Sequence, residues 1–218
     1  MNSVTSFPSS NDFSGPAAWR FLWRFAALAV LLGAGSYFCG AALGDILLPA
    51  FQAEINWLDD TYRIDRLFVD TEGADQVVRI VVGLAHCVVL PDGAHCADPR
   101  GMANASTLLG HITLSASLLV AFAMAWPARW PREYLWRLVA LLPAVSLLWA
   151  LDVPFVLWSA LWSLHVDIFA PDMFSPLSVW VKFLQGGGRL FLACLFGLAV
   201  IGFARYLESQ LLRSSRAR

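Results

Sequence analysis

Charged residues are scarce in this 218-residue sequence. Asp, Glu, Lys and Arg make up 14% of it, against about 25% in soluble domains. Hydrophobic residues make up 58% and the mean hydropathy is +0.62. The formal net charge is −1 and no basic patch stands out, which argues against a disordered protein and against a nucleic-acid partner. The composition therefore predicts an α-helical integral membrane protein whose first partner is the lipid bilayer.

Several catalytic signatures are also missing. The sequence has no G-x-x-x-x-G-K-[ST] phosphate loop, no H-E-x-x-H zinc motif and no G-x-S-x-G nucleophile motif. Its hydrophobic segments do not form two halves with matched interruptions, which argues against an inverted-repeat transporter. These absences favour a non-enzymatic protein without a cofactor.

Four hydrophobic segments are long enough to cross about 30 Å of bilayer hydrocarbon, which takes about 20 residues. We predict transmembrane helices at residues 19–50, 106–126, 138–163 and 189–206, the third kinked at Pro154. The other segments are a disordered tail (1–18), an extracytoplasmic β-containing domain (51–105), a loop (127–137), an outer loop with an interfacial helix (164–188) and a second tail (207–218).

Basic residues are distributed unevenly around these segments. Nine of the 15 flank the segments on the side of the two tails, which the positive-inside rule assigns to the cytoplasm. Between Phe51 and Thr107 there are nine acids and four bases. The first apolar run is longer than the 7–15 residues of a signal peptide core and no A-x-A cleavage site follows it. We predict an uncleaved membrane protein with both termini cytoplasmic.

The outer segment carries strand signals. Residues 63–69 mix charged and apolar side chains, and residues 76–90 are rich in Val and Ile, with Gly83 as a candidate bulge. Turn residues at 71–75 and 91–93 separate these runs. We expect a small antiparallel sheet of two or three strands, which needs the membrane surface or another protein to stabilise it.

The tripeptide Ala-His-Cys occurs twice, nine residues apart. Its side chains His86, Cys87, His95 and Cys96 are zinc or copper ligands in principle. Adjacent residues of a strand point to opposite faces, however, so a regular hairpin has both cysteines on one face and both histidines on the other. We therefore favour a Cys87–Cys96 disulfide over free thiols and over a metal site.

Asp152 is unusual within an apolar segment, because a carboxylate at a helix centre costs about 2.5–3.5 kcal/mol. It is the candidate for a proton relay, a cation site or a catalytic acid. The alternative is a structural acid that fixes the position of its helix.

Two geometries give Asp152 different partners. An unbroken helix over residues 179–206 places Arg189 at the level of Asp152, where the two can pair. A short surface helix that starts at Ser175-Pro176 leaves Arg189 at the headgroup boundary, so that Asp152 depends on His111 or water. We favour the second geometry, because three glycines continue a helix only at a cost.

Small residues recur at helical spacing in two of the predicted spans. Such stripes allow close helix contact, either inside the bundle or with a partner. They are formed by Ser36, Gly40 and Gly44 and, in a shorter version, by Ala193 and Gly197.

Four short phrases resemble the small exosortase-associated membrane proteins of Gram-negative bacteria: NASTLLG (104–110), AWP (125–127), LDVP (151–154) and FLQGGGR (183–189). In layout the resemblance covers most of the chain. It implies an inner-membrane accessory of surface-protein sorting or polysaccharide export, with other membrane proteins as partners.

The sorting enzyme itself has a different pattern. Exosortases resemble cysteine transpeptidases, with a Cys followed along the chain by Arg and His at the outer face. Here Cys194 has no His after it, and Arg205 is expected to be cytoplasmic. The sequence thus favours an accessory or assembly subunit. The alternative is an intramembrane enzyme or proton-coupled transport component that uses Asp152 with His111 or Arg189.

Overall fold

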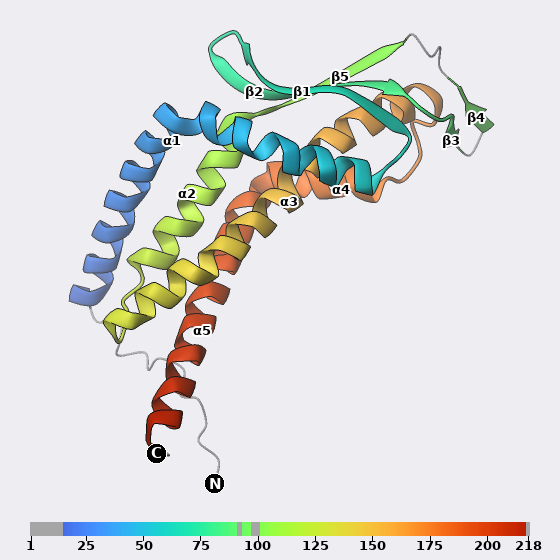
Figure 1. The fold of residues 1–218 in the computed structure, drawn as a ribbon. Helices are drawn as coiled ribbons and strands as arrows, with labels where there is room; N and C mark the ends of the chain where they lie inside the picture. Colours follow the sequence, from blue (N-terminus) through green and yellow to red (C-terminus); the bar gives the residue numbers. More distant parts are fainter. Residues whose placement is uncertain (1–14, 91–92, 97–100, 217–218) are drawn as a thin grey trace.

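The computed structural model describes residues 15–90, 93–96 and 101–216 and shows apolar helices with a small antiparallel sheet at one end (Figure 1). Most of the predicted N-terminal tail, residues 1–14, lies outside the described residues. Residues 15–18 are already helical, so the predicted end of that tail is wrong.

The first helix, α1 (Gly15–Leu58), is longer than the predicted 19–50. It has two limbs: the first runs beside α2 and the second lies beneath the sheet (Figure 1). The helix continues past Pro49 because Phe51 and Ile55, 3% and 1% exposed, are buried in the core below the sheet. The β-containing segment therefore starts after Leu58 rather than at residue 51.

The three-stranded sheet has the order β1-β2-β5, with β1 (Tyr62–Glu72), β2 (Asp75–Leu84) and β5 (Met102–Leu108) all antiparallel. The predicted turn at 71–75 joins β1 and β2 through Gly73, whose φ of 64° favours glycine. The sheet itself is confirmed. Its bulge lies in β1, between Ile64 and Arg66, and not at the predicted Gly83.

The third strand, β5, occupies residues where we predicted the start of a transmembrane helix at 106. The following helix, α2 (Leu109–Ala125), begins three residues later. In β5 the buried residues Ala105 and Thr107 alternate with more exposed neighbours, which is the period of a strand and not of a helix. A separate hairpin of β3 (Val88–Leu90) and β4 (Gly93–His95) lies at the edge of the domain.

The remaining helices are α3 (Pro131–Phe169), α4 (Pro176–Phe183) and α5 (Arg189–Arg216), with a kinked segment, η2 (Leu184–Gly188), between the last two. These helices are longer than the predicted spans 138–163 and 189–206, and they occupy parts of the predicted loops 127–137 and 164–188. The first turns of α3 lie within the predicted loop because Glu133 and Arg137 are buried there, and its end is extended by the buried Val166.

In the part of the chain that the structure describes, three helical stretches are long and apolar enough to cross a membrane: Ala18–Leu58, Pro131–Phe169 and Pro176–Leu211. The apolar helix α2 has 17 residues, about 26 Å at 1.5 Å per residue, against about 30 Å of hydrocarbon. The architecture is compatible with a multi-pass membrane protein.

Both small-residue stripes lie at contacts between helices of this chain, where they allow α2 to pack closely against α1 and α5. A Cβ on Gly44 would lie 2.9 Å from a methyl carbon of Leu109 in α2, and Ser36 Oγ is 3.0 Å from Ser117 Oγ in α2. Gly197 in α5 lies against Phe122 of α2. Of the two uses predicted for these stripes, the structure shows packing within the bundle.

Replacing Gly197 by Ala should destabilise the protein, because the new Cβ would lie 2.6 Å from Cδ1 of Phe122. Overpacking of this kind costs about 1–3 kcal/mol. Gly202→Ala in the same helix is the control, since nothing lies within 4 Å of its Cβ position. Thermal unfolding in detergent should show a lower Tm for Gly197→Ala alone, and equal Tm values for both variants would contradict this packing.

Candidate functional site

Asp152 and Arg189 form a two-pronged ion pair between α3 and the start of α5. Arg189 donates from Nε to Asp152 Oδ2 at 2.7 Å and from Nη2 to Oδ1 at 2.8 Å. The side chains are 11% exposed for Arg189 and 3% for Asp152. Both carboxylate oxygens are therefore bonded to one guanidinium, the geometry in which arginine binds carboxylate best.

The structure combines features of the two predicted geometries: it has the short helix of the second and the Asp152–Arg189 pair of the first. The short helix starting at Pro176 is present, and the Ser175 side chain accepts a hydrogen bond from Ser178 N. The glycine run does interrupt the helix, since Gly187 has φ 103°. The expectation that Asp152 depends on His111 or water is wrong, because the chain turns at Gly187 and Arg189 pairs with Asp152.

Tryptophans support α3 near the ion pair. Trp180 Nε1 in α4 donates to the carbonyl of Leu151 at 2.9 Å, and Trp149 Nε1 donates to the carbonyl of Ile112 in α2 at 2.9 Å. Pro154 removes one backbone donor from this part of α3. The indole bonds thus connect α2, α3 and α4 around Asp152.

His111 does not bond with Asp152. Its Nδ1 is buried and has no hydrogen-bond partner in the part of the chain that the structure describes. His111 also lines a cavity of about 740 Å³ between α1, α2 and the β1–β2 turn. Of the three candidates, the structure joins Asp152 with Arg189 and does not bond His111 to either of them.

A second buried ion cluster joins α3 to α5 and was not predicted. Glu133 and Arg137, 1% and 0% exposed, form a salt bridge one helical turn apart. Arg205 donates from Nε to Glu133 Oε1 at 3.3 Å. Glu133 and Arg137 are four residues apart, which makes them neighbours on one helix face, and this spacing is the signal that could have revealed the pair. The pair was missed because Arg137 and Arg205 were considered only as indicators of membrane orientation.

Arg137 also caps the carboxyl end of α2. Its Nη1 donates to the carbonyls of Ala123 at 2.8 Å and Trp126 at 2.6 Å. The last carbonyls of a helix have no donor within the helix. One arginine therefore neutralises Glu133 and satisfies the buried end of α2.

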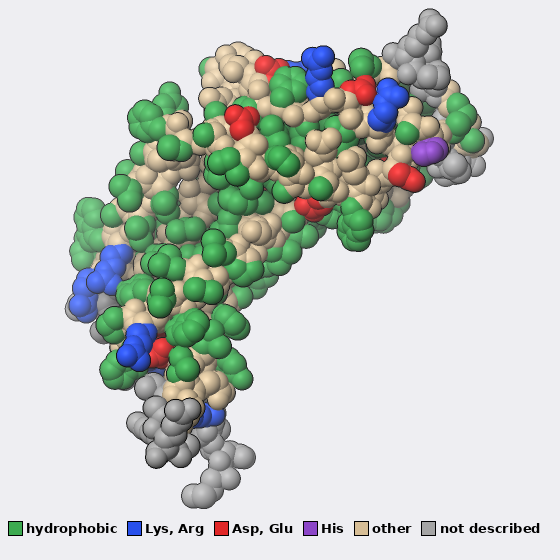
Figure 2. Space-filling model, in the orientation of Figure 1, with side chains coloured by type: hydrophobic (Ala, Val, Ile, Leu, Met, Phe, Trp, Pro, Cys, Tyr) green, Lys and Arg blue, Asp and Glu red, His purple; other side chains and the backbone are tan. Residues whose placement is uncertain are grey.

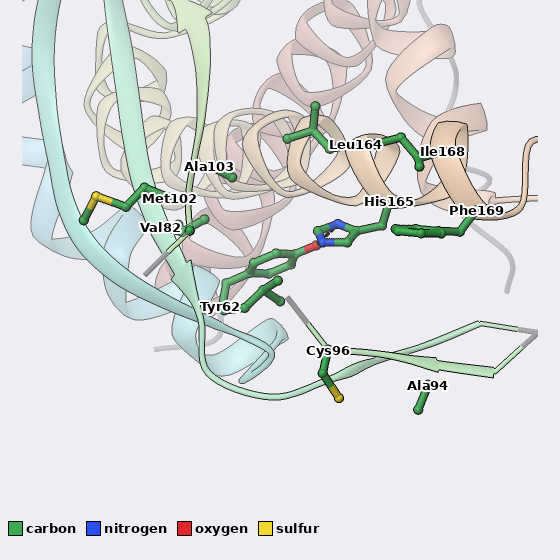
Figure 3. Close-up of a pocket in the computed structure, with 12 residues that line it drawn as sticks. Tyr62, Val82, Ala94, Cys96, Met102, Ala103, Leu164, His165, Ile168 and Phe169 are labelled. Carbon is green, nitrogen blue, oxygen red and sulfur yellow. Dashed lines mark hydrogen bonds between the residues drawn. The ribbon is translucent and has the colours of Figure 1, made fainter. Parts of the chain in front are cut away.

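At the carboxyl end of α3, Tyr62 and His165 line a cavity of about 530 Å³ between β5, the β3–β4 hairpin and the last turns of α3 (Figure 3). Tyr62 Oη lies 3.1 Å from His165 Nδ1. Burial, and secondly the negative charge of Asp59, raise the pKa of Tyr62, so the phenol stays protonated. The rest of the wall is apolar, with side chains such as Leu164 and Ile168.

Cys87 and Cys96 are joined by a disulfide, as predicted, with their Cα atoms 4.3 Å apart. The hairpin register pairs Val88 with His95, which places the two cysteines opposite each other in the next position. His86 Nδ1 lies 3.1 Å from the carbonyl of Asp60. The side chain of His95 lies outside the described residues, and among the described ones no group of three His, Cys, Asp or Glu is placed to hold a metal ion.

Replacing Cys87 or Cys96 by Ser should leave the helices inserted but make the hairpin sensitive to protease, because the bond closes a short loop on a small sheet. Limited proteolysis of the membrane-embedded protein should cut the variants near residue 92 before the wild type. Alkylation without reductant, followed by mass spectrometry, gives the direct check: wild-type thiols at both positions should be unlabelled, and labelling of both would refute the bond.

Neither a family model, nor a curated protein, nor a solved structure matches this chain.

Proposed function

We propose that this chain is a non-enzymatic accessory or assembly subunit of the bacterial inner membrane. The ion pair of Asp152 and Arg189 carries the proposal, because both oxygens of the most unusual acid are bound by an arginine that is only 11% exposed. A proton relay or catalytic acid needs an oxygen that is free to exchange protons or to touch a substrate. The pair instead holds α3 and α5 in one relative position, as expected of a subunit whose role is assembly.

The proposed membrane arrangement has four transmembrane helices, with α2 as the shortest, and cytoplasmic termini. Hydrophobic side chains cover the helical body, and the visible charged side chains gather toward its two ends (Figure 2). The sheet and the disulfide hairpin are then extracytoplasmic. An oxidising outer compartment is where a disulfide persists, which supports this orientation independently of the arginine count.

Reporter fusions test the orientation. Fusions at Arg132 and at the C-terminus should give cytoplasmic reporter activity, and a fusion near residue 92 should give activity outside, because the basic residues cluster on the side of the tails. An inside signal at residue 92 would overturn the arrangement.

The system served, we propose, is surface-protein sorting or polysaccharide export. Three of the four phrases that carry the resemblance lie where elements of the structure meet. Residues 104–110 include the junction of β5 and α2, residues 151–154 include Asp152, and residues 183–189 include η2 and Arg189. The resemblance thus involves residues that determine the packing. Deleting the gene should reduce either processing of sorted surface proteins or surface polysaccharide, and a deletion strain normal in both would refute this assignment.

A second candidate function, proton-coupled transport or intramembrane catalysis, is favoured by one observation. His111 has a buried Nδ1 without a partner among the described residues. His111→Asn decides between the candidates. Normal protein abundance with lost function would favour the second candidate, whereas normal abundance with normal function would favour the accessory role.

A further inference from the structure

The sheet has two edge strands, and they differ in how they are protected. Within the described residues β1 and β5 each hydrogen-bond only with β2. An unpaired edge is a template for pairing with another chain, and proteins usually protect it with charges or bulges. In β1 five of eleven residues are charged and the strand is interrupted by a bulge. That edge is protected against added strands.

The β5 edge has neither device. Its sequence MANASTL contains no charged residue and no proline, and its register with β2 is regular from Met102 to Leu108. Met102, 66% exposed, lies at the end of the strand that is farthest from α2. This edge is open to strand addition in a way that the β1 edge is not.

The cavity with Tyr62 and His165 lies directly beside this end of β5. Gly101, Met102 and Ala103 form one of its walls, and Leu164, His165 and Ile168 of α3 form the opposite wall (Figure 3). Its volume of about 530 Å³ is within the range of ligand pockets. A strand added at β5 would place alternate side chains toward this cavity.

The chemistry of the wall determines which side chains fit. Tyr62 and His165 contribute the polar side chains, and they are bonded to each other. Ile168, 70% exposed, extends the apolar wall outward at the rim. A charged side chain would lose its hydration here without gaining a partner, so the cavity favours an uncharged, apolar occupant.

We infer that the β5 edge and the adjacent cavity bind an uncharged, extended segment of an extracytoplasmic partner protein by strand addition. Backbone hydrogen bonds with β5 would supply affinity, and apolar side chains at alternate positions would enter the cavity. The inference deepens the proposed assembly function by naming the surface and the kind of segment that it binds, and to that extent rests on it.

The test uses the full-length protein in detergent and a fluorescein-labelled peptide of alternating Val and Thr, equal in length to β5. A second peptide has the same sequence but carries N-methyl groups on the backbone amides that would face β5. It partitions into micelles equally, but these amides cannot donate hydrogen bonds to the carbonyls of β5. Fluorescence anisotropy should show saturable binding of the first peptide and at least about tenfold weaker binding of the second. Equal binding of the two, or no saturable binding, overturns the inference.

Two variants locate the site. Ala103→Trp fills the cavity, and Ile168→Asp charges its rim at an exposed position on which folding does not depend. Both should weaken binding at least about tenfold, while Thr71→Trp, exposed at the far end of β1, should bind as the wild type. If Ile168→Asp folds with an unchanged Tm and binds normally, the site is elsewhere.

A second copy of this chain is the competing occupant of the edge. Light scattering that shows a dimer dispersed by Ile168→Asp, together with a failure of the peptide to dissociate it, would replace the partner with self-association and overturn the inference. Peptide binding to the purified protein does not depend on the cellular system served. Its failure therefore leaves the deletion phenotype, which tests the proposed function, unaffected.

Discussion

Replacing Asp152 by Asn should lower the free energy of unfolding of the detergent-solubilised protein by about 3–5 kcal/mol. The substitution leaves the Arg189 guanidinium, 11% exposed, without its counter-charge between α3 and α5. The cost arises mainly from this unpaired charge. Thermal or denaturant unfolding followed by tryptophan fluorescence measures it directly.

The control for this variant is Asp45→Asn, which removes the same charge from an exposed position of α1. It should change the stability by less than about 0.5 kcal/mol. The double variant Asp152→Leu with Arg189→Met should recover most of the lost stability, because it removes both charges together. If the double variant is as unstable as Asp152→Asn, the ion pair contributes more to the free energy of unfolding than the neutralisation of its two charges by each other.

Replacing Arg137 by Met should have an effect at least as large, about 3–5 kcal/mol. Arg137 is fully buried and binds Glu133 as well as the carbonyls of Ala123 and Trp126. Its loss removes the buried guanidinium from the Glu133 carboxylate, which keeps the donors Arg205 Nε and Arg129 N, and from the carbonyls of Ala123 and Trp126 at the end of α2. The measurement is again the unfolding transition in detergent, together with protein abundance in membranes.

Arg137→Lys should not rescue the protein, since an ammonium group cannot reach both carbonyls and the carboxylate as a planar guanidinium does. Arg132→Met, at an exposed position one turn earlier, is the matched control and should be neutral. An Arg137→Met variant with wild-type stability would show that α2 does not need this cap.

Local patterns in the sequence predicted the apolar helices, the small sheet and the disulfide. The turn at 71–75 and the Cys87–Cys96 disulfide depend on residues that are close together in the sequence, so both could be predicted from the sequence alone. The extension of α1 to Leu58 could not, because it depends on Phe51 and Ile55 packing against strands that come later in the sequence. For β5 the short run MANASTL fits a strand or a helix start, and only pairing with β2 decides between them.

The ion pairs required three-dimensional information of a different kind. Three glycines indicate that a helix is interrupted, but not in which direction the chain continues. The positive φ at Gly187 fixes that direction and brings Arg189 to Asp152. Glu133 and Arg137 were identifiable as neighbours on one helix face, yet their burial depends on α2 ending beside them.

We propose that Asp152 and Arg189 stabilise the subunit and take no part in chemistry. Expressing the Asp152→Leu, Arg189→Met double variant in the deletion strain tests this role most directly, with protein abundance in membranes measured alongside surface-protein processing and surface polysaccharide. We expect near wild-type abundance and restoration of whichever output the deletion reduces. Normal abundance without restoration would contradict it and assign a chemical role to the pair.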